Sequence, residues 1–380
     1  MLEREIFEEE HEIFRQSVRR FFEEEIVPYH EGWEDQGYVD RAAWLKAGEH
    51  GLLCTSIPEE YGGSGAERRY SAVLVEEQAR SGATGPGFML HSDIVGPYIL
   101  RYGSEDQKKT WLPKMASGEV IASIGMTEPG AGSDLQAIRT TAIRDGNELV
   151  INGSKIFITN GWNCDLVVVA CKTDPEARAK GISLVLVETG TPGFEKGRRL
   201  KKTAYKAQDT AELFFDDVRV PATNMLGEEG KGFAYLMEEL AWERLLSAIR
   251  ATQVSETAIE QTIAYTKERE AFGRPIAGFQ NTRFKMAQAA TETQILRVFM
   301  DKCILMASEG TLDNVTSAMA KYWSNELMCR VVDECVQLHG GYGVMYEYPI
   351  ARAYMDARPG PITAGTSEIM QEIISRDLMK

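Results

Sequence analysis

The sequence predicts an α+β fold of three domains: an N-terminal helical domain, a middle antiparallel β-barrel or sandwich, and a C-terminal four-helix bundle. The chain has 380 residues, which is too long for one compact core. Apolar residues recur at helical spacing in its first and last parts. Short β-rich runs separated by turn residues fill the part between them. We therefore expect domains at residues 1–121, 122–226 and 227–380.

The N-terminal domain is expected to be helical throughout. Its first helix carries apolar residues at helical spacing among charges, and we expect Pro28 and Gly32 to end it. A turn-rich stretch follows at 58–65. Another helix should begin near Arg68 and stop at Gly82, where a glycine-rich stretch starts.

The middle domain is expected to consist of short strands. Gly, Asn, Asp and Pro separate them, as in an antiparallel barrel or sandwich. The run 166–170 lacks polar alternation, which indicates a strand buried on both faces. The predicted strands are 148–151, 156–159, 166–170, 182–187 and 211–215.

The C-terminal domain returns to the helical pattern. Long antiparallel helices of this kind form bundles, with the apolar faces turned inward. The predicted helices are 233–269, 286–308, 312–339 and 367–378.

Composition narrows the class of protein. The formal net charge is −15 and no basic face stands out, which argues against nucleic-acid binding. No apolar run reaches the ~18–20 residues of a membrane span, and the acidic N-terminus lacks the pattern of a signal or transit peptide. We expect a bacterial cytoplasmic protein or, for a processed organellar one, a mitochondrial matrix protein.

Cysteine, histidine and glycine spacings indicate no metal site and no nucleotide loop. The six cysteines form no C-x-x-C pair, and we interpret them as reduced thiols. The five histidines lie far apart. The run that begins at Gly341 starts like a dinucleotide loop, but Tyr346 stands where its last glycine belongs.

Four segments, in order along the chain, carry a resemblance to a known family. Residues 126–134 read MTEPGAGSD, and residues 152–160 read NGSKIFITN. Residues 269–273 read REAFG, with Gln280 after them, and the last segment runs from QLHGG at 337–341 to GTSE at 365–368. The ordered set resembles the acyl-CoA dehydrogenase family, whose fold has the helix–β–helix layout predicted above. The last seventy residues look most like its long-chain branch.

The resemblance implies a reaction and a cofactor. It implies FAD-dependent α,β-dehydrogenation of acyl-CoA thioesters to trans-2-enoyl-CoA, on long-chain or methyl-branched acyl groups, in fatty acid β-oxidation. Electron-transferring flavoprotein is the implied electron acceptor. The residues that the resemblance implies for FAD are Ile124, Met126, Thr127, Gly132, Ser133, Phe157, Thr159, Arg269, Phe272, Gln280, Gln337, Gly340, Gly341, Thr366 and Glu368.

The residue types in the first two segments suit a flavin. Gly130 and Gly132 let the backbone approach a flat ring and a pyrophosphate. By resemblance, Thr159 would lie near the reactive nitrogen of the flavin, Phe157 against the ring, and Ser133 would bond the pyrophosphate. T-E-P-G alone is more often a simple turn; the other three segments favour the cofactor.

The third and fourth segments imply an oligomer. Arg269, Phe272, Gln280, Gln337 and Gly341 match positions that, in the family, reach the FAD of a neighbouring subunit. The planar fork of an arginine can bond two oxygens of a pyrophosphate at once. An isolated Arg269 would otherwise be a solvated residue at a helix end. The resemblance thus implies a homo-oligomer, a dimer or a homotetramer.

The catalytic base departs from the commonest family pattern. The reaction needs a carboxylate beside the α-carbon of the thioester, and many members carry it directly before the last Gly-Thr. That position is Ala364 here. The long-chain and isovaleryl-type branches place the base on the first long helix of the bundle, in a Glu-Arg-Leu context, which matches Glu243-Arg244-Leu245.

Helical periodicity supports Glu243 as the base. Phe233, Leu236 and Ala248 share one apolar face with Arg244, and Glu243 lies at the edge of that face. Burial would raise the pKa of such a carboxyl into the working range of a base. The neighbouring carboxylates at 238 and 239 are interpreted as ordinary surface charges.

The remaining substrate contacts follow from the resemblance. The enolate oxygen needs hydrogen-bond donors, and the backbone N–H of Ala364 is expected to be one of them. Ser133, Arg244 and Gly365 are the expected substrate contacts. Small side chains at 364 and 365 leave space that would accept methyl branches.

Three alternatives stay open at this point. An isovaleryl-type or other short branched-chain dehydrogenase would use the same base. An oxidase or monooxygenase on the same fold would let oxygen reach the reduced flavin. A non-catalytic, flavin-free relative is a third reading, against which the retained Thr127, Ser133, Thr159 and Glu243 argue.

Overall fold

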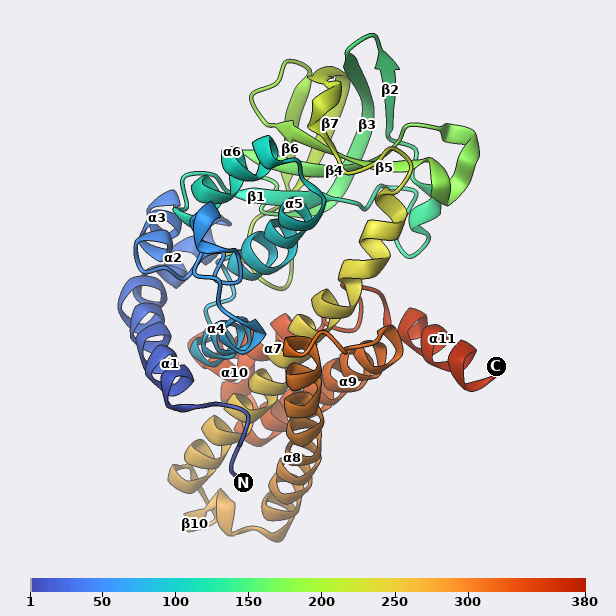
Figure 1. Ribbon diagram of the computed structural model, residues 1–380. Helices are drawn as coiled ribbons and strands as arrows, with labels where there is room; N and C mark the ends of the chain where they lie inside the picture. Colours follow the sequence, from blue (N-terminus) through green and yellow to red (C-terminus); the bar gives the residue numbers. More distant parts are fainter. Residues whose placement is uncertain (1) are drawn as a thin grey trace.

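Helices from both ends of the chain flank a β-sheet domain at one end of the molecule. The computed structural model describes residues 2–380. In Figure 1 the sheet lies at the top, the N-terminal helices along the left, and the C-terminal helices below, with helix α7 running from the sheet domain down through the C-terminal helices. This order of helices, strands and helices is the one predicted. The exact boundaries after residues 121 and 226 stay a prediction.

The prediction that Pro28 and Gly32 end the first helix is wrong. Helix α1 (Glu9–Phe21) continues through a π-helical turn into α2 (Val27–Gln36). Pro28 occupies the first turn of α2, where a proline is tolerated because the missing N–H would have no partner within the helix. Gly32 lies inside α2, and the chain leaves the helix only at Gly37, at φ 79°.

The other N-terminal helices follow this pair along the chain, and α4 packs against α1. The helix predicted near Arg68 is confirmed, and Gly82 ends it in the left-handed conformation, at φ 72°. Two π-helical segments occur, Phe22–Ile26 and Leu90–Val95. The remaining α-helices are α3 (Arg41–Glu49), α4 (Arg68–Ser81), α5 (Gly96–Tyr102) and α6 (Glu105–Ala116).

The middle domain contains one eight-stranded sheet. Its strands run in the order β6-β7-β3-β2-β4-β5-β8, and β1 pairs with β4. Most pairs are antiparallel as predicted, but β1 and β2 each pair with β4 in parallel, so the purely antiparallel prediction is wrong at β4. The strands are β1 (Ala122–Gly125), β2 (Thr141–Asp145), β3 (Glu148–Thr159), β4 (Leu166–Lys172), β5 (Ile182–Glu188), β6 (Phe194–Arg199), β7 (Thr210–Pro221) and β8 (Met225–Leu226).

Strand β3 unites two runs that the sequence separates. The runs 148–151 and 156–159 are one strand, because the chain passes through Gly153 at φ 147° and irregular pairing with β7. Bulges of this kind keep a strand continuous while they bend it. Strand β4 is buried on both faces from Leu166 to Cys171, as predicted.

The C-terminal helices surround α7. Helix α8 begins at Gln280, six residues before the predicted start at 286, directly after the extended residue Phe279. Helix α10 was not predicted. The helices are α7 (Gly232–Glu268), α8 (Gln280–Ser308), α9 (Asn314–His339), α10 (Pro349–Ala357) and α11 (Ser367–Leu378), and a short hairpin of β9 (Glu270–Ala271) and β10 (Arg274–Pro275) joins α7 to α8.

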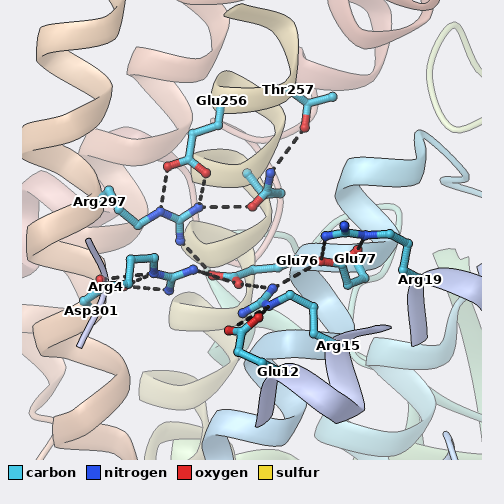
Figure 2. A network of polar contacts seen from close by, with 11 residues as sticks. Arg4, Glu12, Arg15, Arg19, Glu76, Glu77, Glu256, Thr257, Arg297 and Asp301 are labelled. Carbon is cyan, nitrogen blue, oxygen red and sulfur yellow. Dashed lines mark hydrogen bonds and ion pairs between the residues drawn. The ribbon is translucent and has the colours of Figure 1, made fainter. Parts of the chain in front are cut away.

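A buried ionic network joins the N-terminal helices to the C-terminal helices (Figure 2). Glu76 on α4 is fully buried and accepts hydrogen bonds from Arg4, Arg15 and Arg297, at 2.9, 2.9 and 2.7 Å. Arg297 on α8 also binds Glu256 on α7. The network therefore ties an N-terminal segment and helices α1, α4, α7 and α8 together.

Two further findings concern the described residues. All six cysteines are free thiols, and five of them are buried. Between residues 2 and 380, none of the helices is both long enough and apolar enough to cross a bilayer.

Candidate active site

The carboxyl group of Glu243 lies in the buried middle of α7. Glu243 is 6% exposed and Arg244 is 5% exposed, because α4, α5 and α9 cover this part of the helix. Tyr98 on α5 donates a hydrogen bond of 2.9 Å to Glu243 Oε1. The prediction that the Glu–Arg pair faces the interior is confirmed.

The surroundings change the acidity of Glu243. Burial raises the pKa of Glu243 to about 7, the hydrogen bond from Tyr98 and the charge of Arg244 oppose that rise, and Glu239 adds to it. A carboxyl with such a pKa is partly ionised at neutral pH and can take a proton from a weak carbon acid. This is the property that the reaction requires of its base.

The prediction that Glu239 is a surface charge is wrong. Glu239 is 5% exposed, and its Oε1 accepts hydrogen bonds from Arg101 at 2.5 Å and Tyr102 at 3.0 Å. Helix α5 covers this face of α7, and helical periodicity within α7 contains no information about that neighbour. Glu238 is exposed, as expected.

Lys321 connects α9, which packs against α7, with the loop that contains Ala364. Its side chain is fully buried, and its ammonium group donates a hydrogen bond to the carbonyl of Gly365. Burial lowers the pKa of Lys321 to about 8, while Glu326 opposes this and Arg244 adds to it. The loop at 364–365 is thereby anchored beside the helix that carries Glu243.

The loop itself has an uncommon backbone. Ala364 adopts φ 55° and Gly365 φ 90°, and a non-glycine residue in the left-handed region is uncommon and worth explaining at a site. Thr366 then caps α11 by accepting from Ile369 N, and Glu368 is exposed on the first turn of that helix. Thr366 thus has a structural role besides the predicted one.

The first two motif segments lie side by side. The loop after β1 runs along the end of β3, where Ile156 N donates to Thr127 O at 2.9 Å and Ser123 Oγ donates to Thr159 O at 2.6 Å. Lys155, which is buried, binds Met126 O at 3.1 Å and Glu128 Oε1 at 2.7 Å. Ile124 is buried in β1 just before this loop.

The loop after β1 and the end of β3 also present an exposed aromatic side chain and backbone N–H groups without an acceptor in the described part of the chain. Phe157 is 65% exposed at φ 60°. Gly132 and Ser133 are exposed, and within residues 2–380 their backbone N–H groups donate to no acceptor. A Cβ at Gly132 would meet no atom within 4 Å. An exposed aromatic face beside unpaired backbone N–H groups suits a flat ring that carries phosphates.

The third segment and the first part of the fourth, residues 337–341, meet at the other end of α7. They line a cavity of about 490 Å³ that contains Arg269, Gln337, Gly340 and Gly341. Phe272, in the hairpin that follows, is 94% exposed, and Gln280 begins α8. Twenty-six helical positions separate Glu243 from Arg269, so roughly 40 Å lies between them at about 1.5 Å per residue.

Three residues of this region were not identified from the sequence. Tyr98, Lys321 and Lys155 each direct a buried donor at a candidate functional segment. Tyr98 is 145 positions from Glu243, and no local spacing relates the two. Lys155 had a signal, since it lies inside the second motif segment.

Comparison with known proteins identifies the family. Three family models match in order: the acyl-CoA dehydrogenase N-terminal domain at residues 8–119, the middle domain at 123–218 and the C-terminal domain at 230–379. This chain belongs to the acyl-CoA dehydrogenase family. It is therefore an oxidoreductase of the class that dehydrogenates acyl-CoA thioesters with FAD.

Individual relatives refine the likeness. The chain is 54% identical to the mitochondrial long-chain specific acyl-CoA dehydrogenase of Sus scrofa over 378 residues, which are 99% of this chain and 88% of that protein. An acyl-CoA dehydrogenase from Geobacillus kaustophilus has a similar structure, with a TM-score of 0.97, 50% identity, and 99% and 100% of the two chains covered. A glutaryl-CoA dehydrogenase from Mycobacterium smegmatis in complex with FADH2 has a TM-score of 0.92 at 28% identity, with 98% and 95% covered.

Proposed function

We propose that this protein removes the α-proton of an acyl-CoA thioester with Glu243. The observation that carries the proposal is the buried carboxyl, hydrogen-bonded by Tyr98 and with its pKa raised to about 7. FAD, when bound, supplies the acceptor for the hydride from the β-carbon. Glu243 holds the α-proton at a carboxylate oxygen, and burial keeps water away from it.

The backbone N–H of Ala364 is proposed to donate to the thioester oxygen as the enolate forms. The anchoring of the adjacent Gly365 carbonyl by Lys321 supports this, since a fixed donor costs no reorganisation during the reaction. Arg244 is proposed for substrate binding, and its buried Nε atom donates no hydrogen bond within residues 2–380. Ser133 and Gly365 complete the proposed substrate contacts.

The proposed cofactor contacts fall into two groups. Ile124, Met126, Thr127, Phe157 and Thr159 would hold the flavin ring. Gly132 and Ser133 would donate their free backbone N–H groups to the pyrophosphate. Thr366 and Glu368 complete the set within one subunit.

The second group is proposed to serve the FAD of a neighbouring subunit. This group lies near the end of α7 that is roughly 40 Å from Glu243 at about 1.5 Å per residue, and it comprises Arg269, Phe272, Gln280, Gln337, Gly340 and Gly341. An aromatic side chain that is 94% exposed suggests a partner surface. We propose a homodimer or homotetramer, which sedimentation velocity tests: a monomer with full FAD content would contradict it.

A long-chain acyl group is the proposed substrate, because the curated relatives with 54% identity are long-chain specific enzymes. The small residues at 364 and 365 support acceptance of methyl branches. We further propose electron-transferring flavoprotein as the acceptor and a bacterial cytoplasmic or mitochondrial matrix location. Steady formation of hydrogen peroxide without an acceptor would instead favour an oxidase.

The central test is anaerobic reduction of the flavin by palmitoyl-CoA. We expect bleaching of the flavin absorbance in the wild type and a rate lower by ~10²–10⁴-fold in Glu243→Gln, the usual contribution of a general base. Glu238→Gln is the matched control, because Glu238 lies on the same helix but is exposed. Equal rates in wild type and Glu243→Gln would refute the base, and no bleaching in any form would refute the substrate.

A further inference from the structure

Tyr98 is the one described residue that donates a hydrogen bond to Glu243. Its hydroxyl lies 2.9 Å from Oε1. Among residues 2–380, no group donates to Oε2. Tyr98 itself is 0% exposed, so water does not compete for its hydroxyl. The two oxygens of the carboxylate are therefore unequal: one is held and the other is free to receive a proton.

The fold fixes Tyr98 firmly. Its ring packs with Val95, Ile99, Leu112 and Leu236 in one buried cluster. The α5 turn that carries it follows directly on the π-helical segment Leu90–Val95, and such segments occur frequently at functional sites. A fully buried ring in a packed cluster has little room to move, which keeps its hydroxyl beside Glu243 Oε1.

Burial also keeps the hydroxyl a donor. It raises the pKa of Tyr98 well above its usual value, and the nearby charges of Glu243 and Glu239 raise it further. The phenol is thus protonated throughout the pH range in which Glu243 titrates. Its hydrogen bond stabilises the ionised form of the carboxyl more than the protonated form and so lowers the pKa of Glu243.

Within the described part of the chain, the other charged groups near Glu243 donate no hydrogen bond to it, although the charge of Arg244 lowers the pKa of Glu243. Glu239 on α7 binds Arg101 and Tyr102 of α5, while the charge of Arg68 on α4 acts on Glu239 and Asp93. Arg244 on α7 donates to Asn314 at 3.3 Å, and Lys321 on α9 donates to the loop. Tyr98 is left as the partner dedicated to Glu243.

We propose that Tyr98 is the positioning residue of the catalytic base: it holds Glu243 Oε1, directs Oε2 to the α-proton and stabilises the carboxylate. The proposal rests on the proposed role of Glu243. Removing the hydroxyl should make the base harder to ionise and free to rotate. The higher pKa of Glu243 and its loss of alignment can each be distinguished from a defect in folding.

The experiment follows anaerobic flavin reduction by palmitoyl-CoA from pH 5.5 to 9 in wild type, Tyr98→Phe, Tyr102→Phe and Glu243→Gln. The rate of flavin reduction should rise with pH as Glu243 ionises, and we call this part of the rate–pH profile its rising limb. In Tyr98→Phe we expect the rising limb to shift to higher pH by about one unit, since hydrogen bonds to charged groups have about that effect. The plateau should fall about tenfold because the base is no longer aligned. Tyr102→Phe is the matched control: it removes a nearby phenol that binds Glu239 and Glu238, and should leave the limb in place.

A second readout does not depend on turnover. Infrared difference spectra of the protein without substrate report the protonated carboxyl, and Glu243→Gln identifies its band. That band should titrate about one pH unit higher in Tyr98→Phe, and lower when 3-fluorotyrosine, a stronger donor, replaces Tyr98. The fluorinated protein keeps the ring and so tests the idea even if Tyr98→Phe folds poorly.

The outcomes separate the two hypotheses. A rate in Glu243→Gln equal to that of the wild type would overturn the base itself. Suppose that Glu243→Gln strongly lowers the rate of flavin reduction, while Tyr98→Phe shifts neither the rising limb of the rate–pH profile nor the titration of the infrared band. That result would overturn the role of Tyr98 alone. A limb that moves equally in Tyr102→Phe would also overturn it, because the effect would then be general to the helix.

Discussion

The buried environment of Glu243 raises the pKa of its carboxyl and therefore lowers the stability of the folded protein at high pH. Its folded pKa of about 7 exceeds the ordinary value of 4.5. A carboxyl raised in this way stabilises the fold fully below its unfolded pKa, and this contribution is lost as the pH rises through the folded pKa. The same burial that raises the pKa of Glu243 into the range proposed for its role as base thus lowers the stability of the fold at neutral and higher pH.

A difference in unfolding free energy follows for Glu243→Gln. The variant cannot ionise, so relative to wild type it should gain ~3 kcal/mol between pH 5 and pH 8, from a shift of about 2.5 units at ~1.36 kcal/mol each. Urea unfolding of both proteins at several pH values measures this. A difference that does not change with pH would mean that Glu243 is already solvated in the folded protein.

The position of the base can be tested by moving it. If Ala364→Glu restores flavin reduction to a Glu243→Gln protein, residues 243 and 364 face the same substrate carbon. We expect recovery of at least tenfold over the single variant, because a carboxylate in place contributes ~10²–10⁴-fold and the new one is imperfectly aligned. Ala364→Gln in the same background is the control. Equal rates of flavin reduction with Gln and with Glu at position 364 would contradict the idea that residues 243 and 364 face the same substrate carbon.

At the scale of the element, the loop after β1 depends on one buried ion pair. Lys155 is 1% exposed and Glu128 is 7% exposed. Glu128 also accepts from the backbone N–H groups of Arg139 and Thr140, at 2.6 and 3.0 Å. The pair therefore fastens both ends of the loop that contains Thr127 and Ser133 to β3.

Lys155→Met should damage both stability and cofactor retention. Removing one partner of a buried pair leaves an unpaired charge and costs roughly 3–5 kcal/mol, and the loosened loop should release FAD. Urea unfolding and the flavin-to-protein absorbance ratio measure the two effects. Glu128→Gln in the same chain removes the stranded charge, so the double variant should recover part of the loss. No recovery would contradict the stranded charge as the cause.

At the scale of the whole molecule, the network of Figure 2 joins the two helical domains. Glu76 receives three arginines, from the N-terminal segment, α1 and α8. Their charges outweigh the effect of burial and lower the pKa of Glu76 to about 2. The stability that this provides is present above the ordinary carboxyl pKa and is lost as the pH falls towards 2.

Glu76→Gln should therefore lower the unfolding free energy by roughly 3–5 kcal/mol at pH 7, because three arginines lose their common partner. The loss should shrink as the pH falls towards 3. Glu260→Gln breaks an exposed pair with Arg80 and should change stability by no more than ~1 kcal/mol. Chemical unfolding of the wild type, Glu76→Gln and Glu260→Gln at pH 7 and pH 4 tests this. If Glu76→Gln lowered the unfolding free energy equally at both pH values, the charge of Glu76 would not be the source of the stability.

Local pattern along the chain was enough to predict the order of helices, strands and helices, the continuous α7 and the buried β4. Four ordered segments were enough to predict the family. Helical periodicity also predicted that Glu243 and Arg244 face the interior. These features are local, or repeat at a period that neighbouring residues reveal.

Only the tertiary structure decided which distant residues meet. It buried Glu239 under α5, continued the first helices past Pro28, and joined two runs into β3. It also brought Tyr98 to Glu243 across 145 positions and Lys321 to the loop at 365. The physical reason is that burial, and the hydrogen bonds and pKa values that depend on it, are properties of packed neighbours, which no spacing along one element contains.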